Sequence, residues 1–281
     1  MSVPIIRTVA ALREDVAAWH KAGEVVGVVP TMGALHQGHL SLVRAAKAEC
    51  DRVIVTIFVN PKQFNSAEDL ENYPRTEEED ARKLAPFEVD AVYVPDGAQM
   101  YPEGFATTVS VAGLTDVLCG AVRPGHFDGV STVVTKLFTQ TQADRAYFGE
   151  KDYQQVQVVT RLARDLDLPI TIVPCPTIRE EDGLAMSSRN LLLSDRARVW
   201  APELHRAMEE MAAGLLAGGD IAELRAAAIA RLERAGFTKV EYLDLRACDD
   251  LRLLEKPDVP ARLLAAAWLA GVRLIDNIAV G

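Results

Sequence analysis

The chain has 281 residues, and 49% of them are hydrophobic, which is enough for one large or two medium-sized packed domains. Its 30 lysines and arginines against 40 aspartates and glutamates give a net charge of −10, which argues against broad binding to nucleic acid or to anionic membranes. An anionic substrate would therefore need a local positive site.

We expect a protein of the cytoplasm that does not enter a membrane. The longest apolar run near the C-terminus, residues 263–272, is shorter than the ~20 residues that span a bilayer. The N-terminus lacks the basic start and continuous apolar core of a signal peptide. The four cysteines are too scattered for a metal or redox motif, so we expect reduced thiols.

In the first two-thirds of the chain, short runs of strand-forming residues alternate with helical patterns, beginning with a helix that Thr8 can cap and Gly23 can end. The expected strands are 25–29, 53–59, 90–94, 145–148 and 170–173, and the expected helices are 38–48, 127–140 and 154–165. This alternation is typical of an α/β protein with a Rossmann-like, doubly wound parallel sheet. In such sheets, ligands bind beyond the carboxyl ends of the strands.

The composition changes after Ser194, which can cap a long helix rich in alanine, arginine and glutamate. A second helix is expected after the turn at 218–220, and strands are expected at 240–245 and 263–274. We therefore predict a Rossmann-like, ligand-binding domain over residues 1–180 and a smaller C-terminal α+β domain over residues 181–281 that closes over the site. The junction near 174–188 can act as a hinge that closes over a ligand.

Segment 30–39, PTMGALHQGH, carries the strongest chemical signal because it leads from an expected strand into an expected helix. Its backbone NH groups and the helix N-terminus can receive phosphate oxygens. Gly33 and Gly38 permit a positive φ or a close ligand. His36 and His39 are near enough in sequence to converge on one anion, to which they can supply hydrogen bonds or positive charge.

Two other interpretations of this segment are less favoured. Gly33 and Gly38 have the spacing of a P-loop, but His39-Leu40 replaces the lysine and the hydroxyl residue of that motif. The two histidines could begin a zinc site, yet an HExxH motif and a third ligand are both missing.

Other polar residues follow the remaining strands. Lys151 can meet a phosphate as a point charge, and Asp152 can cap a helix or accept from a ribose hydroxyl. The loop at 183–190 offers two hydroxyls and a guanidinium, which suit a polyphosphate but also fit a polar hinge. Asn60, Gln63 and Gln155 carry uncharged amides that suit a small hydroxy acid.

Two further segments remain open between a structural and a functional interpretation. Segment 123–127, RPGHF, is either an anion contact or an ordinary turn before a helix. The acidic stretch 68–80 is favoured as a solvated surface loop, with a mobile lid over the site as the alternative.

Taken together, five segments resemble the pantoate–beta-alanine ligase (pantothenate synthetase) family of the HxGH nucleotidyltransferase-like superfamily. They are PTMGALHQGH, IFVNPKQF, YPRT, FGEKDYQQ and DGLAMSSRN, in family order over about the first 190 residues. The mobile KMSKS loop of the wider superfamily is matched here by residues 186–189, where Arg189 replaces a lysine. The C-terminal third shows no comparable signature.

The resemblance implies that the chain condenses (R)-pantoate with beta-alanine through a pantoyl adenylate, with release of AMP and diphosphate from ATP. It implies catalytic roles for His39, His36, Lys151 and Arg189. The residues implied for ATP binding are Met32, Gly33, Ala34, Leu35, His36, Gln37, Gly38, His39, Gly149, Glu150, Lys151, Asp152, Ile178, Met186, Ser187, Ser188 and Arg189.

For the other substrates, the family pattern implies that Gln63 and Gln155 bind pantoate and that Gln63 also lies near beta-alanine. Tyr73 and its acidic neighbours would form the lid. Mg²⁺ is expected to bind mainly through ATP oxygens, and no protein ligand for it is assigned. A homodimer is expected, with no nucleic-acid or membrane partner.

Two other functions compete with this one. A plain nucleotidyltransferase would leave AMP on its product. A non-catalytic nucleotide-binding module would bind ATP without any acid-dependent turnover.

Overall fold

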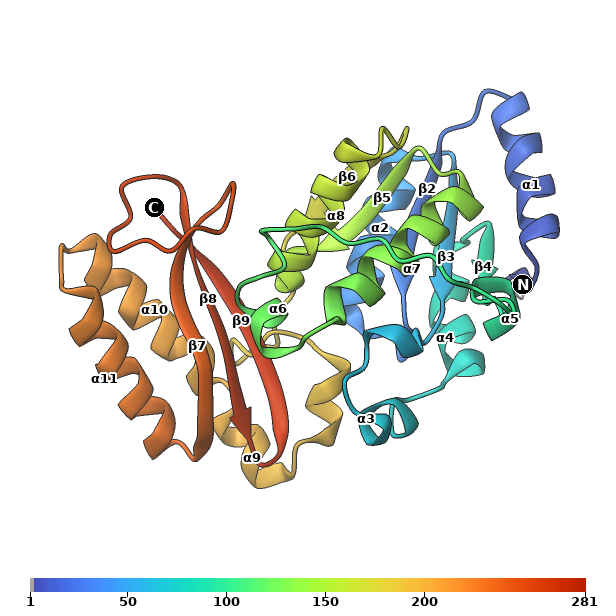
Figure 1. Cartoon of the computed structure of the whole chain (residues 1–281). Helices are drawn as coiled ribbons and strands as arrows, with labels where there is room; N and C mark the ends of the chain where they lie inside the picture. The colour runs from blue at the N-terminus through green and yellow to red at the C-terminus, as the bar shows by residue number, and fades with distance from the viewer. Residues whose placement is uncertain (1–2) are drawn as a thin grey trace.

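The structure, a computed structural model, describes residues 3–281 and contains two separate β-sheets (Figure 1). The larger sheet has six parallel strands in the order β1-β4-β3-β2-β5-β6, and the smaller has three antiparallel strands in the order β7-β8-β9. The strands are β1 (Ile5–Ile6), β2 (Val26–Thr31), β3 (Arg52–Ile57), β4 (Ala91–Tyr93), β5 (Arg145–Gly149), β6 (Thr171–Cys175), β7 (Phe237–Ala247), β8 (Ala261–Leu269) and β9 (Val272–Val280). The predicted α/β fold class, with a smaller α+β part, is confirmed.

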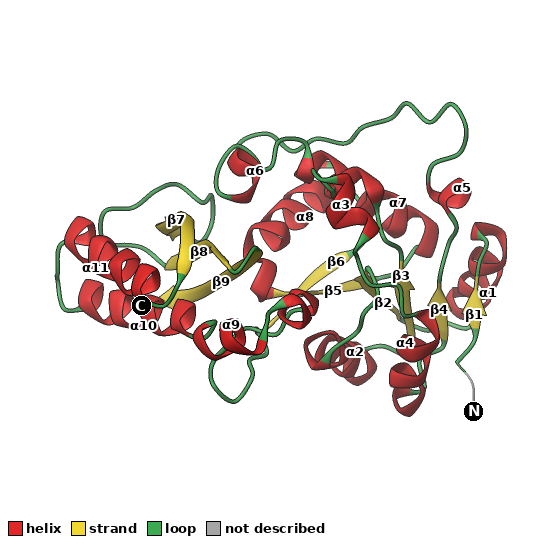
Figure 2. Cartoon of the chain, turned by 90° about the horizontal axis from the view of Figure 1, so that it is seen from below, coloured by secondary structure: helices red, strands yellow, loops and turns green. Residues whose placement is uncertain are grey.

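Helices cover both faces of the larger sheet, as Figure 2 shows for α7 and α8 on one side and α2 and α4 on the other. The α-helices are α1 (Val9–Lys21), α2 (Gln37–Glu49), α3 (Ala67–Glu71), α4 (Glu77–Leu84), α5 (Gly97–Met100), α6 (Cys119–Val122), α7 (His126–Thr141), α8 (Tyr153–Asp165), α9 (Asp195–Trp200), α10 (Glu203–Leu216) and α11 (Ile221–Arg234). The short 3₁₀ helices are η1 (Pro61–Gln63), η2 (Ala85–Phe87), η3 (Glu150–Asp152) and η4 (Ser188–Leu192).

The apolar strands divide their side chains between the two cores. Val28 packs with the α1, α7 and α8 side, whereas Val29 packs with the α2 and α4 side. Successive strand residues point to opposite faces, so a sheet covered on both sides needs a continuous apolar run. Helix α1 begins where expected, since the Thr8 side chain accepts from the Ala11 NH at 3.3 Å.

The hydrogen-bond ladder between β2 and β5 is short. All six residues of β2 pair with β3, but only Gly27 and Val28 pair with β5, opposite Arg145 and Ala146. Beyond these pairs the carboxyl halves of β2 and β5 are not joined by a ladder. This point is also where the strand order reverses, because β3 lies on one side of β2 and β6 lies on the far side of β5. Ligands of doubly wound sheets bind at such a point.

Three expectations for local structure are wrong in detail. The single long helix after Ser194 is broken into α9 and α10, because Pro202 has no NH to continue the helical hydrogen bonds. The strand expected at 263–274 is two strands, joined by a tight turn in which Ala270 and Gly271 have φ values of 49° and 80°. The acidic stretch 68–80 is largely helical, in α3 and the start of α4.

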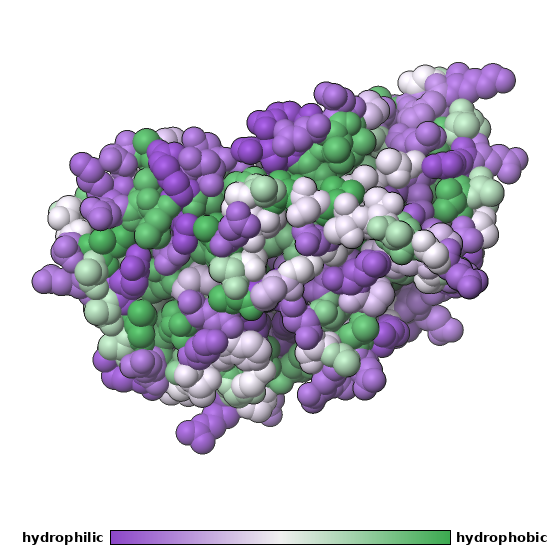
Figure 3. Space-filling model, in the orientation of Figure 1, coloured by the Kyte–Doolittle hydropathy of each residue, from purple (hydrophilic) through white to green (hydrophobic). Residues whose placement is uncertain are grey.

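Helices α10 and α11 pack on the three-stranded sheet and enclose a core separate from the two cores of the larger sheet. Hydrophilic side chains cover most of the rim of the face shown in Figure 3, and hydrophobic side chains show between them over the three-stranded sheet. No helix within residues 3–281 combines the length and the apolar character that crossing a membrane requires. All four cysteines are free, as expected.

Candidate active site

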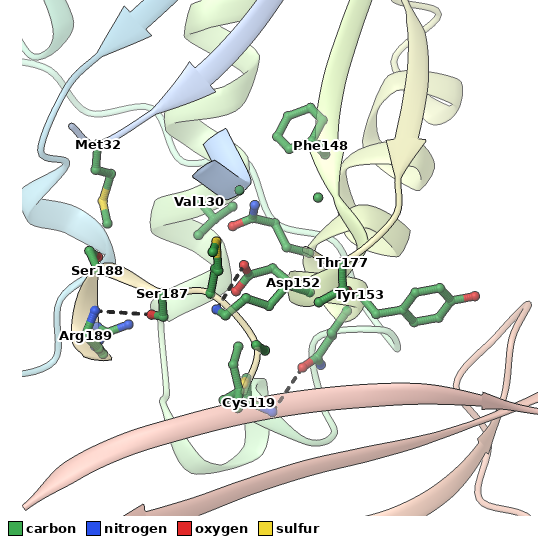
Figure 4. Close-up of a pocket in the computed structure, with 18 of the residues that line it drawn as sticks. Met32, Cys119, Val130, Phe148, Asp152, Tyr153, Thr177, Ser187, Ser188 and Arg189 are labelled. Atoms are coloured by element: carbon green, nitrogen blue, oxygen red, sulfur yellow. Dashed lines mark hydrogen bonds and ion pairs between the residues drawn. The ribbon is translucent and has the colours of Figure 1, made fainter. Parts of the chain in front are cut away.

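A cavity of about 270 Å³ opens beyond the carboxyl ends of β2, β3 and β5 and is closed on another side by residues of the three-stranded sheet. Most of the predicted site residues line it, and Figure 4 shows several of them converging. They are Met32, His36, Gly38, His39, Gln63, Gly149, Lys151, Asp152, Gln155, Ile178, Met186, Ser187, Ser188 and Arg189. The five other residues implied for ATP, namely Gly33, Ala34, Leu35, Gln37 and Glu150, are not among its lining residues.

The first part of the glycine-bearing loop is bonded within the protein. The Gly33 NH donates to the Thr31 hydroxyl at 3.1 Å, and the NH groups of Ala34 and Leu35 donate to the Asp80 carboxylate at 2.9 and 2.7 Å. Asp80 is fully buried, so these bonds are shielded from water. These three NH groups, which were expected to bind phosphate, therefore hold the shape of the loop instead. Asp80 is a structural residue of the site, and no sequence signal separates it from its acidic neighbours.

His36 and His39 lie ring against ring, with centroids 4.1 Å apart, at the start of α2. The Nδ1 atom of His36 accepts from the Gly38 NH at 3.1 Å, and the Nδ1 atom of His39 accepts from the His36 NH at 3.3 Å. Each neutral ring must therefore carry its proton on Nε2. The two side chains cap the helix with one nitrogen and keep the other as a donor.

Burial keeps both rings neutral. Burial and the charge of Lys151 lower the pKa of His36 to about 4, and burial and the neighbouring His36 lower the pKa of His39 to about 3. Of the two roles that the sequence offers, hydrogen-bond donation is thus favoured over positive charge in the ligand-free protein.

Lys151 and Arg189 line the cavity and come from two different loops. Lys151, in η3, has its Nζ atom 3.6 Å from Asp152 Oδ2. Although burial raises the pKa of Asp152, Lys151 and Arg189 lower it more, so its net pKa lies below the usual range. Arg189 lies at the start of η4, where its NH donates to Ser187 Oγ at 3.2 Å (Figure 4). The acidic chain therefore does present a locally positive site.

A network of amides holds another part of the cavity wall. Gln63 donates through Nε2 to Met32 Sδ at 3.1 Å and accepts from Asn60 Nδ2 at 3.0 Å. Asn60 is buried and also donates to the Gly129 carbonyl at 3.0 Å. A Cβ at Gly129 would lie 2.2 Å from the Lys62 carbonyl oxygen, so only glycine lets α7 pack this closely. The adjacent cavity wall is apolar and includes Phe58, Phe127, Val130, Val133 and Val134.

The RPGHF turn serves as both a turn and a part of the cavity wall. The Gln63 carbonyl accepts from His126 Nδ1 at 2.8 Å and from Arg123 Nη2 at 3.2 Å. Burial lowers the pKa of Arg123, and burial with the nearby Arg123 charge lowers that of His126 to about 4. Both residues line the cavity. Their hydrogen bonds to the Gln63 carbonyl fix the backbone at this position.

The acidic segment 68–80 covers one side of the site. Asp69 Oδ2 lies 3.3 Å from Arg189 Nη2, and Tyr73 lines the cavity with its ring 5.5 Å from that of Phe64. The interpretation as a solvated loop fails for Asp80, which is buried. The interpretation as a lid agrees with the position of Asp69 and Tyr73.

The C-terminal part of the chain was expected to close over the site, but sequence reasoning named none of the residues of the three-stranded sheet that contribute to it. Asn277 donates through Nδ2 to the carbonyls of Glu150 and Lys151, at 2.8 and 2.9 Å. Asp276 forms a two-pronged ion pair with Arg179, at 2.7 and 2.9 Å. Two adjacent polar residues between apolar residues of one strand were the available signal, because buried polar groups need partners.

Comparison with known proteins agrees with this geometry. The family model described as pantoate-beta-alanine ligase matches residues 4–279. Pantothenate synthetases of Roseobacter denitrificans and Ruegeria pomeroyi are 70% and 66% identical over 280 residues, covering 100% of this chain and 99% and 98% of theirs.

Solved structures extend the likeness to the fold. Pantothenate synthetase from Thermus thermophilus superposes with a TM-score of 0.93 at 46% identity, over 99% of each chain. Pantoate-beta-alanine ligase from Francisella tularensis, solved in complex with beta-gamma ATP and beta-alanine, has a TM-score of 0.84 at 34% identity, over 99% of this chain and 98% of that one. The chain therefore belongs to the pantoate–beta-alanine ligase family, the pantothenate synthetases.

Proposed function

We propose that this ligase joins (R)-pantoate to beta-alanine in two steps within the one cavity. First, a pantoate carboxylate oxygen attacks the α-phosphorus of MgATP in line, the bond to diphosphate breaks, and pantoyl adenylate forms. The amine of beta-alanine then attacks the acyl carbon, the bond to AMP breaks, and the nitrogen loses a proton to give the amide. The observation that supports this proposal most is that two histidines and two cationic side chains line the same cavity as the amide groups of Gln63 and Gln155.

The phosphate end would work mainly through positioning and electrostatics. The Nε2–H groups of His36 and His39 would donate to phosphate oxygens, and the charges of Lys151 and Arg189 would stabilise the negative charge that builds up as diphosphate leaves. The bound triphosphate would raise the low pKa values of the histidines, because a nearby anion favours the protonated ring. The hydroxyls of Ser187 and Ser188 add donors on the side of Arg189.

The remaining assignments follow the layout of the cavity. We propose that the other ATP contacts come from the residues of segments 32–39 and 149–152 that line the cavity, namely Met32, Gly38, Gly149 and Asp152, and from Ile178 and Met186. Gln63 and Gln155 would hold the polar groups of pantoate against the apolar wall, and Gln63 would also lie near beta-alanine. The Francisella relative in complex with ATP and beta-alanine supports the choice of these two substrates.

Magnesium enters this proposal as part of the MgATP substrate, bound through phosphate oxygens. Within residues 3–281, no three histidine, cysteine, aspartate or glutamate side chains cluster in a way that could hold a metal ion. The donor groups of the cavity thus fit a metal that arrives with the nucleotide.

Release of AMP, measured with ATP, magnesium, pantoate and beta-alanine and with each omitted in turn, tests the proposal. We expect free AMP and diphosphate only when all four are present, and pantoate-dependent ATP/diphosphate exchange without beta-alanine. A stable adenylated product in the complete mixture would instead favour a plain nucleotidyltransferase. ATP binding without turnover would favour a binding module.

His39→Ala tests the role of the histidine within the same assay. We expect exchange to fall by about 10²-fold or more, since donors aimed at developing charge typically contribute that much. His20→Ala, on the outer helix α1, is the matched control and keeps wild-type exchange. Full exchange in His39→Ala would remove this histidine from the mechanism.

We also propose that the chain divides into two domains near residue 180, acts in the cytoplasm and forms a homodimer. The separate cores of the two sheets support the division. Sedimentation equilibrium of the full chain tests the oligomeric state, for which a mass near twice 30.6 kDa is expected.

A further inference from the structure

Strand β9 forms the edge of the three-stranded sheet, and its middle carries two adjacent polar residues that are almost fully buried. Asp276 is 4% exposed and Asn277 is 3% exposed. Neighbours on a strand point to opposite sides, so the two side chains leave β9 in different directions. Each reaches a different loop of the proposed phosphate-binding site.

Asp276 holds the loop that leads to η4. Besides its two bonds to Asp276, Arg179 donates to the Gly183 carbonyl at 3.0 Å, and Arg179 forms an isolated β-bridge with Ala185. These contacts close a short hairpin immediately before residues 187–189. Burial raises the pKa of Asp276, but His205 and Arg179 lower it by more. The net pKa therefore lies below its usual range, and the carboxylate is charged at neutral pH.

Asn277 holds the other loop. Its amide donates to the carbonyls of Glu150 and Lys151, and its Oδ1 accepts from Arg262 Nη1. Arg262 also reaches the Glu150 carboxylate, at 3.4 Å. The backbone of η3, from which the Lys151 side chain enters the cavity, is therefore fixed by contacts with β8 and β9.

We propose that Asp276 and Asn277 are positioning residues that hold the Lys151 loop and the Ser187–Arg189 loop at the separation one triphosphate requires. The two loops belong to distant parts of the chain, and adjacent residues of one strand tie both to the same rigid element. Because a shift of about 1 Å in a catalytic group can cost as much as 10²-fold in rate, such a tie bears directly on activity. This inference rests on the proposed phosphate-binding roles of Lys151 and Arg189.

If Asp276 and Asn277 only joined the two sheets, their replacement would lower activity equally with and without the matching cation. Double-mutant cycles can test this alternative. We would combine Asp276→Asn with Arg189→Ala, and Asn277→Ala with Lys151→Ala, and measure kcat/KM for ATP by pantoate-dependent ATP/diphosphate exchange. Asp244→Asn is the matched control, because Asp244 pairs with Arg246 inside the same sheet, at 2.6 Å.

We expect Asp276→Asn and Asn277→Ala each to lower kcat/KM for ATP by about tenfold or more in the wild-type background, and by less than about threefold once the matching cation is gone. In crossed pairs, such as Asp276→Asn with Lys151→Ala, the effects of the two replacements on kcat/KM for ATP should be closer to additive. The KM for beta-alanine should remain within about twofold, and Asp244→Asn should match the wild type.

Equal losses with and without the matching cation would overturn the proposal, as would unchanged kcat/KM in both single variants. If Asp276→Asn does not fold, Arg179→Gln probes the same contact from the loop side and is judged by the same cycle. Absence of pantoate-dependent exchange in the wild type would instead contradict the proposed function, so the two failures are distinguishable.

Discussion

The buried carboxylate of Asp80, in α4, accepts a 2.9 Å hydrogen bond from the backbone NH of Ala34, a residue held at a positive φ of 51°. The same carboxylate accepts from Leu35 and from the Thr76 hydroxyl. A left-handed alanine is strained, so the loop keeps this shape because the surrounding contacts require it. Asp80 thus supports the loop that carries the two histidines.

Asp80→Ala should therefore destabilise the protein substantially. Two buried NH groups would lose their acceptor, and each such loss costs about 1–3 kcal/mol of unfolding free energy. Urea denaturation followed by circular dichroism measures the effect. Glu79→Gln, one residue earlier and exposed, is the control, and an equally small shift in both variants would contradict the structural role of Asp80.

The neutral histidines predict a specific dependence of stability on pH. Between pH 6.5 and about 4, the unfolded chain binds protons at His36 and His39 that the folded chain does not bind, so the free energy of unfolding falls as the pH falls through this window. The slope is at most about 1.4 kcal/mol per pH unit for each histidine.

The double variant His36→Asn/His39→Asn should reduce this slope to the part that His126 contributes, because the amide oxygen can replace Nδ1 as a cap but does not titrate. Urea midpoints at pH 7, 6 and 5 would be compared with those of the wild type. Gln37→Ala, between the two histidines, should keep the wild-type slope. An unchanged slope in the double variant would show that the rings are not held neutral by the fold.

Gln154 and Gln155 are adjacent, yet we expect their replacement to have different effects. Both line the cavity, but Gln154 is buried and its side chain satisfies the carbonyls of Leu114 and Val117 and the NH of Cys119, whereas Gln155 is half-buried. Gln154→Ala should lower the unfolding free energy by about 1–3 kcal/mol. Gln155→Ala should instead raise the KM for pantoate about tenfold, with little change in that for ATP.

Steady-state kinetics and urea denaturation of both glutamine variants provide this comparison, and each variant serves as the control for the other. The assignment of Gln155 to pantoate would be withdrawn if its variant changed only stability or changed only the KM for ATP.

Asp69→Asn should tighten ATP binding. Asp69 and ATP phosphates would compete for Arg189, and the pair is partly exposed, so its loss should change stability by no more than about 1 kcal/mol. We expect the KM for ATP to fall severalfold, most clearly at low ionic strength. Glu71→Gln removes the same charge from the same helix and should have a smaller effect. An unchanged or raised KM in Asp69→Asn would argue against the competition.

Elements with a strong local pattern could be predicted from the sequence. Strand β3 and helix α7 lie within two residues of their expected bounds, because each has its own apolar run or helical spacing. The two-residue strand β1 was missed since a segment this short has no measurable period. The hairpin turn at Ala270 and Gly271 was missed because apolar residues continue on both sides of it.

The candidate site shows the same division. Recognisable motifs at the ends of strands or helices contain His36, Lys151 and Arg189. These residues could therefore be predicted from their local sequence. Asp80 and Asn277 act through contacts with residues far away in the chain, and only the folded structure brings these partners together. Residues within recognisable motifs could thus be predicted more readily than those that hold them in place.

The short ladder between β2 and β5 has a consequence for how the protein acquires activity. The main chain itself leaves the opening between β2 and β5, within the sheet. This opening forms only after the strands on either side of it have paired. We therefore expect nucleotide-binding capacity to return in the same cooperative transition as secondary structure during refolding. A folded population that has formed its sheet but lacks room for ATP should not accumulate.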